Sequence, residues 1–126
     1  MTSHETWRRA SRSSELELGL DIVEIDRIRR LAKNASRFLP RVFTAQEIAY
    51  CRGKKNPWQH FAVRFAAKEA VWKALDRDGI SLRDISVSRD ARGKPGVLLK
   101  GKKAAGFKLS LSHSDRYAVA VAVKVK

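Results

Sequence analysis

Apolar and polar side chains alternate over the first patterned stretch of the chain, which begins at Glu15. Every second residue is aliphatic, which is the period of a half-buried β-strand, at Leu16, Leu18, Leu20 and Ile22. From about Glu24 apolar residues recur at helical spacing instead, at Ile25, Ile28 and Leu31. We therefore expect a strand followed directly by a helix. A loop is then predicted over residues 36–41, where Pro40 bars a continued helix.

Two further helices are predicted in the middle of the chain. The first begins after Thr44, whose hydroxyl can cap it, and Glu47 is placed to complete a capping box. It ends at Gly53. The second is the longest helical pattern and runs from residue 57 or 58 to residue 75, with alanines on one side and Phe61, Phe65 and Trp72 on another. A helix that is apolar on two sides is normally packed on both, so we expect it at the centre of the fold.

The remaining chain predicts strands. Apolar and polar residues alternate over 85–88, 107–112 and 117–125, and a further apolar run covers 97–99. A turn is expected over residues 92–96 and the break of a hairpin over 113–116. Helices early and antiparallel strands late indicate a mixed α+β domain.

Length and composition limit the class of protein. The 126 residues suit one domain, which we place over residues 15–126, after a polar, flexible N-terminal extension at residues 1–14 that lacks the apolar stretch of a secretory signal. No apolar run approaches the ~20 residues of a membrane span, which predicts a soluble protein. Cys51 is the only cysteine, so no intramolecular disulfide can form, and this fits a reducing cytoplasm.

Charge indicates a polyanionic partner. Lysine and arginine number 27 against 13 aspartates and glutamates, and the formal net charge is +14. The excess is spread over both halves of the chain rather than held in one tail. It is compatible with nucleic acid, an acidic membrane, a phosphate-bearing ligand or an acidic protein, so charge alone does not choose among them.

Two carboxylates stand in apolar surroundings. Asp21 lies inside the first strand, where an uncompensated charge is costly, so it must be paired or hold a metal unless it caps the following helix. Glu69 and Lys73 share a face of the long helix, beside Phe65 and Trp72, and a plain surface ion pair is the alternative. Carboxylates from two elements suit Mg²⁺, and Lys73 could then neutralise a phosphate or assist proton transfer. His113, at the end of a strand, is a weaker candidate on its own.

Four blocks follow one another in the order of a known family. They are residues 19–28 (GLDIVEIDRI), Phe43-Thr44 with Glu47, residues 64–70 (RFAAKEA) with Lys73-Ala74, and residues 110–113 (SLSH). Together they resemble holo-acyl-carrier-protein synthase, the short class of 4′-phosphopantetheinyl transferases. The third block is highly specific, whereas any other block alone is a weak signal.

The resemblance implies an activity and a fold. Members of this family move the phosphopantetheine arm of coenzyme A onto a serine of an apo acyl carrier protein, in fatty-acid biosynthesis, and release adenosine 3′,5′-bisphosphate. The implied architecture is the 4′-phosphopantetheinyl transferase fold, an antiparallel sheet packed around a long central helix with one domain per chain. Family members of this length are usually cytoplasmic homotrimers with active sites at the subunit junctions.

The resemblance also implies roles for individual residues. Asp21 and Glu69 match the Mg²⁺ ligands. Catalysis is implied for Glu69, Lys73 and His113, and either Glu69 or a metal-bound water takes the serine proton. Coenzyme A binding is implied for Arg64, Lys73, Gly79, Lys94, Pro95 and His113. The basic surface that receives the acidic carrier protein corresponds to Arg27, Arg30, Arg37 and Arg41.

One stretch departs from the family pattern, which usually has Gly-Thr-Gly after the central helix. Here the residues are Leu75-Asp76-Arg77-Asp78-Gly79, so only Gly79 keeps the phosphate-cradling role. This departure leaves open an inactive transferase that serves as a binding protein. A small nucleic-acid-binding module is a further alternative, resting on the charge, on residues 100–103 and on Trp58 and Phe107 as stacking rings. It leaves Asp21 and Glu69 unexplained, and we therefore expect no nucleic-acid or membrane partner.

Overall fold

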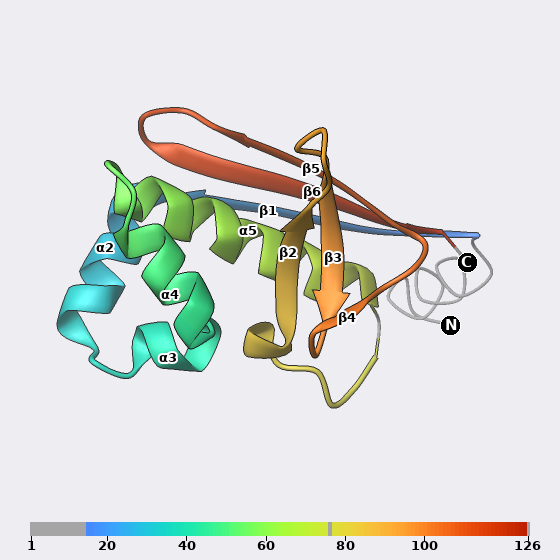
Figure 1. Cartoon of the computed structure of the whole chain (residues 1–126), viewed down its shortest axis with the longest axis horizontal. Helices are drawn as coiled ribbons and strands as arrows, with labels where there is room; N and C mark the ends of the chain where they lie inside the picture. The colour runs from blue at the N-terminus through green and yellow to red at the C-terminus, as the bar shows by residue number, and fades with distance from the viewer. Residues whose placement is uncertain (1–14, 76, 126) are drawn as a thin grey trace, which may run out of the picture.

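Helix α5 (Pro57–Leu75) lies at the centre of the computed structural model, which describes residues 15–75 and 77–125 (Figure 1). Its bounds match the long helix predicted from the sequence. One side is a row of fully buried alanines, at Ala62, Ala66, Ala67, Ala70 and Ala74. On another side Phe61 packs on Phe43, with ring centroids 5.1 Å apart. The helix is therefore covered on two sides, as predicted, although Trp72 is 48% exposed.

An antiparallel sheet covers the alanine side of α5. Its strands β1 (Leu16–Glu24), β6 (Tyr117–Val125) and β5 (Phe107–His113) are arranged in the order β1-β6-β5. The inner face of β6 is also alanine, fully buried at Ala118, Ala120 and Ala122. Small residues on both elements allow close approach, and a Cβ built on Gly19 would lie 1.8 Å from the Ala70 carbonyl oxygen. Strand β1 and helix α5 are thus in backbone contact at Gly19.

A second antiparallel sheet packs in front of α5 (Figure 1). The 3₁₀ turn η1 (Leu82–Asp84) leads into β2 (Ile85–Arg89), β3 (Pro95–Leu99) and β4 (Lys102–Lys103), in the order β2-β3-β4. The turn between β2 and β3 is closed by Asp90, whose Oδ1 accepts from the backbone nitrogen of Lys94 at 2.9 Å. The predicted α+β class with a central helix is confirmed, and the antiparallel strands form two sheets where the sequence predicted one.

Three short helices cover the other end of α5: α2 (Ile25–Asn34), α3 (Phe38–Val42) and α4 (Ala45–Arg52). The capping box predicted for α4 is present, with Thr44 Oγ1 accepting from the Glu47 backbone nitrogen at 3.2 Å. The loop predicted over residues 36–41 is confirmed only at residues 36 and 37, which form a turn, and is wrong from residue 38 onward, where α3 contains Pro40. Pro40 is the third residue of α3, where the backbone N–H has no partner within a helix, so proline costs nothing there.

The outer face of the β1-β6-β5 sheet is apolar and exposed. Leu18, Leu20 and Ile22 of β1 are 68%, 59% and 64% exposed. The register places Leu20 beside Val121 of β6, which is itself 38% exposed. The strand is half-buried as predicted, but its buried half is the side with Gly19, and the aliphatic side faces outward.

Among the described residues, no helix is long and apolar enough to cross a membrane. Trp58 and Phe107, the rings that nucleic-acid stacking would use, are half-buried and pack against the core. Residues 1–14, predicted as a flexible extension, and Asp76 lie outside the described residues.

Candidate functional site

Asp21 lies on the side of β1 that faces helix α5. Its side chain is 17% exposed. Lys73 of α5 places its Nζ 3.4 Å from Asp21 Oδ1 and donates to the Leu20 carbonyl oxygen at 2.9 Å. The alternative in which Asp21 caps the next helix is wrong, since the N-cap of α2 is Glu24 and makes no side-chain cap hydrogen bond. The structure therefore brings Asp21 and Lys73 together as an ion pair, which partly compensates the charge of Asp21.

Glu69 shares this site with Asp21. Burial raises the pKa of Glu69, and the negative charge of Asp21 raises it further, against an opposing effect of Lys73. Burial likewise raises the pKa of Asp21, opposed by Lys73 and by Arg27. Two carboxylates whose pKa values are raised by burial are costly to keep ionised, and this cost is relieved when they share a cation.

The donor set fits Mg²⁺. Asp21 Oδ2 is buried and has no hydrogen-bond partner within residues 15–75 and 77–125. An orphaned carboxylate oxygen beside a second carboxylate is what a hard cation with oxygen ligands requires. No group of three potential His, Cys, Asp or Glu ligands occurs in the described part of the chain. A two-carboxylate site suits Mg²⁺ better than Zn²⁺, because Mg²⁺ usually keeps waters and substrate phosphates as its other ligands.

His113 is held by a residue that the sequence did not indicate. His113 is the last residue of β5, and its Nδ1 lies 2.9 Å from Nε2 of Gln59 in the first turn of α5. The amide N–H donates, so Nδ1 accepts and Nε2 carries the proton. Gln59 thereby fixes the orientation of the imidazole. Nothing in the sequence pattern links two residues so far apart, on a helix and on a strand.

The residues expected to bind coenzyme A are not gathered at one place in the chain. Arg64 lies over the Tyr50 ring, 4.3 Å from its centroid, and lines a cavity of about 590 Å³ between α4 and the second sheet. Lys94 and Pro95 line a different cavity, of about 280 Å³, on the β2–β3 hairpin. Gly79 has φ +81, a left-handed conformation that favours glycine, and a Cβ built there would have no neighbour within 4 Å.

Basic residues are exposed along α2 and α3. Arg27, Arg37 and Arg41 are exposed, and Arg27 is close enough to Asp21 to lower its pKa. Arg30 is also exposed, but Asp26 Oδ2 lies 3.2 Å from its Nη1, so its charge is partly neutralised. Arg27 therefore lies beside the carboxylate site, and Arg30 is the member of the expected carrier-protein surface whose charge is partly neutralised.

Comparison with known proteins gives a consistent result. The family model described as the 4′-phosphopantetheinyl transferase superfamily matches residues 17–122. The chain is 47% identical over 120 residues to a holo-[acyl-carrier-protein] synthase of Geotalea daltonii, covering 86% of this chain and 96% of the relative. It is 42% identical over 121 residues to one of Caldanaerobacter subterraneus, covering 88% and 95%.

Solved structures agree with the sequence comparison. The chain resembles a holo-(acyl-carrier-protein) synthase of Bacillus anthracis in complex with CoA (3′,5′-ADP), with a TM-score of 0.71, 36% identity and coverage of 87% of this chain and 96% of that one. It also resembles the enzyme of Helicobacter pylori in complex with coenzyme A, with a TM-score of 0.68, 31% identity and coverage of 86% and 99%.

Proposed function

This chain belongs to the 4′-phosphopantetheinyl transferase superfamily, and on that premise we propose that it primes an acyl carrier protein. The reaction transfers the 4′-phosphopantetheine arm of coenzyme A to a serine hydroxyl of the apo carrier protein and releases adenosine 3′,5′-bisphosphate. The observation that carries the proposal is the pair of half-buried carboxylates, Asp21 and Glu69, beside Lys73.

We assign Mg²⁺ to Asp21 and Glu69. When bound there, the ion supplies positive charge that stabilises the negative charge developing on the diphosphate. The unpartnered Oδ2 of Asp21 supports this assignment. Magnesium uses one or two carboxylates and leaves the remaining positions to phosphate oxygens and water, which suits a diphosphate substrate.

The chain's own residues supply the rest of the chemistry. The Lys73 ammonium is held by the Leu20 carbonyl oxygen and by Asp21, so its charge is fixed beside the carboxylates, where it can offset charge on the leaving bisphosphate. The raised pKa of Glu69 brings it closer to the range of a general base for the serine proton. His113, with its Nε2–H left free by Gln59, can donate to a phosphate oxygen.

We propose a homotrimer with active sites at the subunit junctions. The outer face of the β1-β6-β5 sheet is apolar and exposed over two strands, with Leu18, Leu20, Ile22 and Val121 among its residues. Faces of this kind on a small domain mark contact surfaces. The separation of Arg64 from Lys94 and Pro95 within one chain supports the same arrangement, because a neighbouring subunit can complete a site that one chain leaves divided.

The proposed partners are coenzyme A and an acidic apo acyl carrier protein of fatty-acid biosynthesis. The exposed Arg27, Arg37 and Arg41 provide the positive surface that such a protein requires. The single thiol, Cys51, is buried and unpaired, which fits the reducing cytoplasm in which we place the enzyme.

Intact-mass measurement tests the transfer. Apo acyl carrier protein is incubated with this protein, coenzyme A and MgCl₂, and its mass is followed with time. We expect each carrier chain to gain the mass of one phosphopantetheine arm, with release of an equal amount of adenosine 3′,5′-bisphosphate. If no carrier protein of a varied set gains this mass, the proposed function is wrong.

A further inference from the structure

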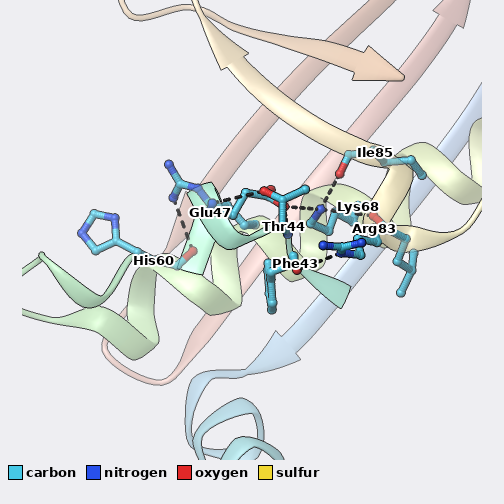
Figure 2. Close-up of polar contacts among 9 residues, drawn as sticks. Phe43, Thr44, Glu47, His60, Lys68, Arg83 and Ile85 are labelled. Carbon is cyan, nitrogen blue, oxygen red and sulfur yellow. Dashed lines mark hydrogen bonds and ion pairs between the residues drawn. The ribbon is translucent and has the colours of Figure 1, made fainter. Parts of the chain in front are cut away.

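Lys68 is a fully buried lysine with no role in the mechanism above. It lies on α5 next to Glu69, and its side chain is 0% exposed. Its Nζ donates to Glu47 Oε1 at 2.9 Å, to the Leu82 carbonyl oxygen at 3.1 Å and to the carbonyl oxygen of Ile85. Figure 2 shows the Lys68 ammonium between Glu47 and Ile85. An ammonium has three N–H donors, and each has an acceptor here.

The three acceptors belong to separate parts of the fold. Glu47 is in the first turn of α4, and its Oε1 also accepts from the Thr44 backbone nitrogen at 2.9 Å. Leu82 begins the 3₁₀ turn η1, and Ile85 begins β2. One side chain of the central helix therefore fixes both the start of α4 and the start of the second sheet.

These two elements are the walls of the cavity of about 590 Å³ that Arg64 lines. Three more cations face the same cavity from the second sheet and its flanks: Arg83, Arg89 and Lys100. Its lining includes two acidic residues, Asp84 and Glu47, and Glu47 is already paired with Lys68. Four cations against one uncompensated acid make a cleft that attracts phosphate-bearing ligands.

Arg83 makes a second link between the same walls. It donates from its Nε to the Phe43 carbonyl oxygen at 3.4 Å, which ties the middle of η1 to the residue before the α4 cap (Figure 2). This contact is longer than the Lys68 contacts to Glu47 at 2.9 Å and to Leu82 at 3.1 Å, and the Lys68 side chain is itself fully buried. The spacing of the walls is therefore determined at Lys68.

Stability alone does not require a lysine at this position. Replacing a buried ion pair with apolar residues of similar volume is often neutral or stabilising. Burial lowers the pKa of Lys68, opposed by Glu47, which reflects the cost of placing this charge in the core. An apolar side chain at this position could not make the three hydrogen bonds by which Lys68 joins α4 to the second sheet.

We propose that Lys68 is a positioning residue for coenzyme A. It holds α4 and the second sheet at the separation that gathers Arg64, Arg83 and Lys100 around one cleft, where they can bind the 3′-phosphate of coenzyme A while its diphosphate lies at Asp21 and Glu69. Lys68 does not touch the ligand itself. The inference rests on the proposed function, since it names the cleft in which coenzyme A is held.

The test compares three proteins: the unaltered chain, Lys68→Met, and the double variant Lys68→Met with Glu47→Gln. Glutamine keeps the capping box of α4 and removes the charge that Lys68→Met leaves unpaired. Measurements are the KM for coenzyme A, the KM for carrier protein, kcat, the Tm, and the Kd of adenosine 3′,5′-bisphosphate by calorimetry.

If Lys68 has a positioning role, the KM for coenzyme A and the Kd of the bisphosphate change separately from the KM for carrier protein and the Tm. We expect Lys68→Met to raise the KM for coenzyme A and the Kd of the bisphosphate about tenfold or more, with a much smaller change in the KM for carrier protein. The double variant should recover part of the lost Tm while its KM for coenzyme A stays high, because the bonds to Leu82 and Ile85 are still absent.

Two results would overturn the inference. One is an unchanged KM for coenzyme A in folded Lys68→Met. The other is recovery of KM together with Tm in the double variant, which would make the role of Lys68 merely structural. If Lys68→Met does not fold, the double variant alone decides the question by its KM and Kd. Failure of the proposed function is distinguishable, because the unaltered chain would then transfer no arm.

Discussion

Gly19→Ala is the substitution whose effect follows most directly from the structure. A Cβ at residue 19 would lie 1.8 Å from the Ala70 carbonyl oxygen and 2.8 Å from its carbonyl carbon. Real Cβ atoms essentially never approach closer than 3.0 Å, so the strand and the helix must separate by about 1.2 Å at this point. The obstructing atoms belong to the backbone, and no side-chain rotation can relieve the clash.

This displacement falls on the proposed metal site. Gly19 is two residues from Asp21 on the same face of β1, and Ala70 directly follows Glu69. Moving the two carboxylates apart by about 1 Å should lower kcat/KM about 100-fold. The overpacked contact should also reduce the free energy of unfolding by about 1–3 kcal/mol.

The assay is the rate of carrier-protein priming by intact mass, together with thermal unfolding. Gly53→Ala is the matched control, since a Cβ there has its nearest neighbour at 3.5 Å and the backbone is already helical, with φ −78 and ψ −4. We expect the control to be close to the unaltered chain in both measurements. Full activity and an unchanged Tm for Gly19→Ala would refute the claim that the β1–α5 contact sets the carboxylate geometry.

Three more predictions concern charge and assembly. Because the pKa of Asp21 is raised in the folded protein, its protonated form contributes stability below about pH 4, and this stability is lost as the pH rises through the raised pKa. Asp21→Asn should therefore raise the Tm of the metal-free protein by a few degrees at pH 7 and hardly at pH 3. An equal or lower Tm of the variant at pH 7 would contradict this. Arg27→Glu should raise the KM for carrier protein about tenfold at low salt and leave the KM for coenzyme A nearly unchanged. Asp26→Asn removes the ion pairs to Arg29 and Arg30 and should lower the KM for carrier protein slightly. Equal effects of Arg27→Glu on both KM values would count against the docking surface. If the proposed trimer forms through the outer face of the β1-β6-β5 sheet, Leu18→Glu should give monomers by light scattering and abolish transfer. Lys102→Glu, on an exposed strand of the second sheet, should do neither. A monomeric unaltered chain with full activity would contradict the proposal of active sites at subunit junctions.

Much of the local structure could be predicted because it depends on neighbours in sequence. The capping box of α4 is a pattern of Thr44 and Glu47, and the long alanine-rich helix is fixed by residue spacing. The loop prediction over Pro40 failed because the rule that proline ends helices does not hold in the first turn. Position within the helix decides the outcome, and the sequence did not reveal where α3 begins.

What depends on tertiary packing could not be predicted. Gln59 meets His113 and Lys68 meets Ile85 only because a helix, a strand and a turn are brought together from distant parts of the chain. The direction in which β1 faces is a similar case, since the aliphatic side of an alternating strand is usually the buried one. Here the side of β1 that carries Gly19 packs against α5, because only a residue without a Cβ fits against the Ala70 backbone.

The sequence predicted which residues belong to the candidate site better than it predicted how they are arranged. Asp21, Glu69 and Lys73 do lie together, and their proximity follows from one strand packing on one helix. Arg64, Lys94 and Pro95 do not join them within the chain. Residue types and family likeness indicate which side chains are candidates for the site, whereas the distances between them depend on how helix α5 packs against strands from distant parts of the sequence.

The central claim is that Asp21 and Glu69 together make this chain a Mg²⁺-dependent transferase. The most direct test follows the mass of apo carrier protein with coenzyme A in three reactions: the unaltered chain with MgCl₂, the same chain with EDTA, and Glu69→Gln with MgCl₂. We predict the gain of one phosphopantetheine arm in the first reaction alone. Complete priming in the presence of EDTA, or by folded Glu69→Gln, would contradict the account.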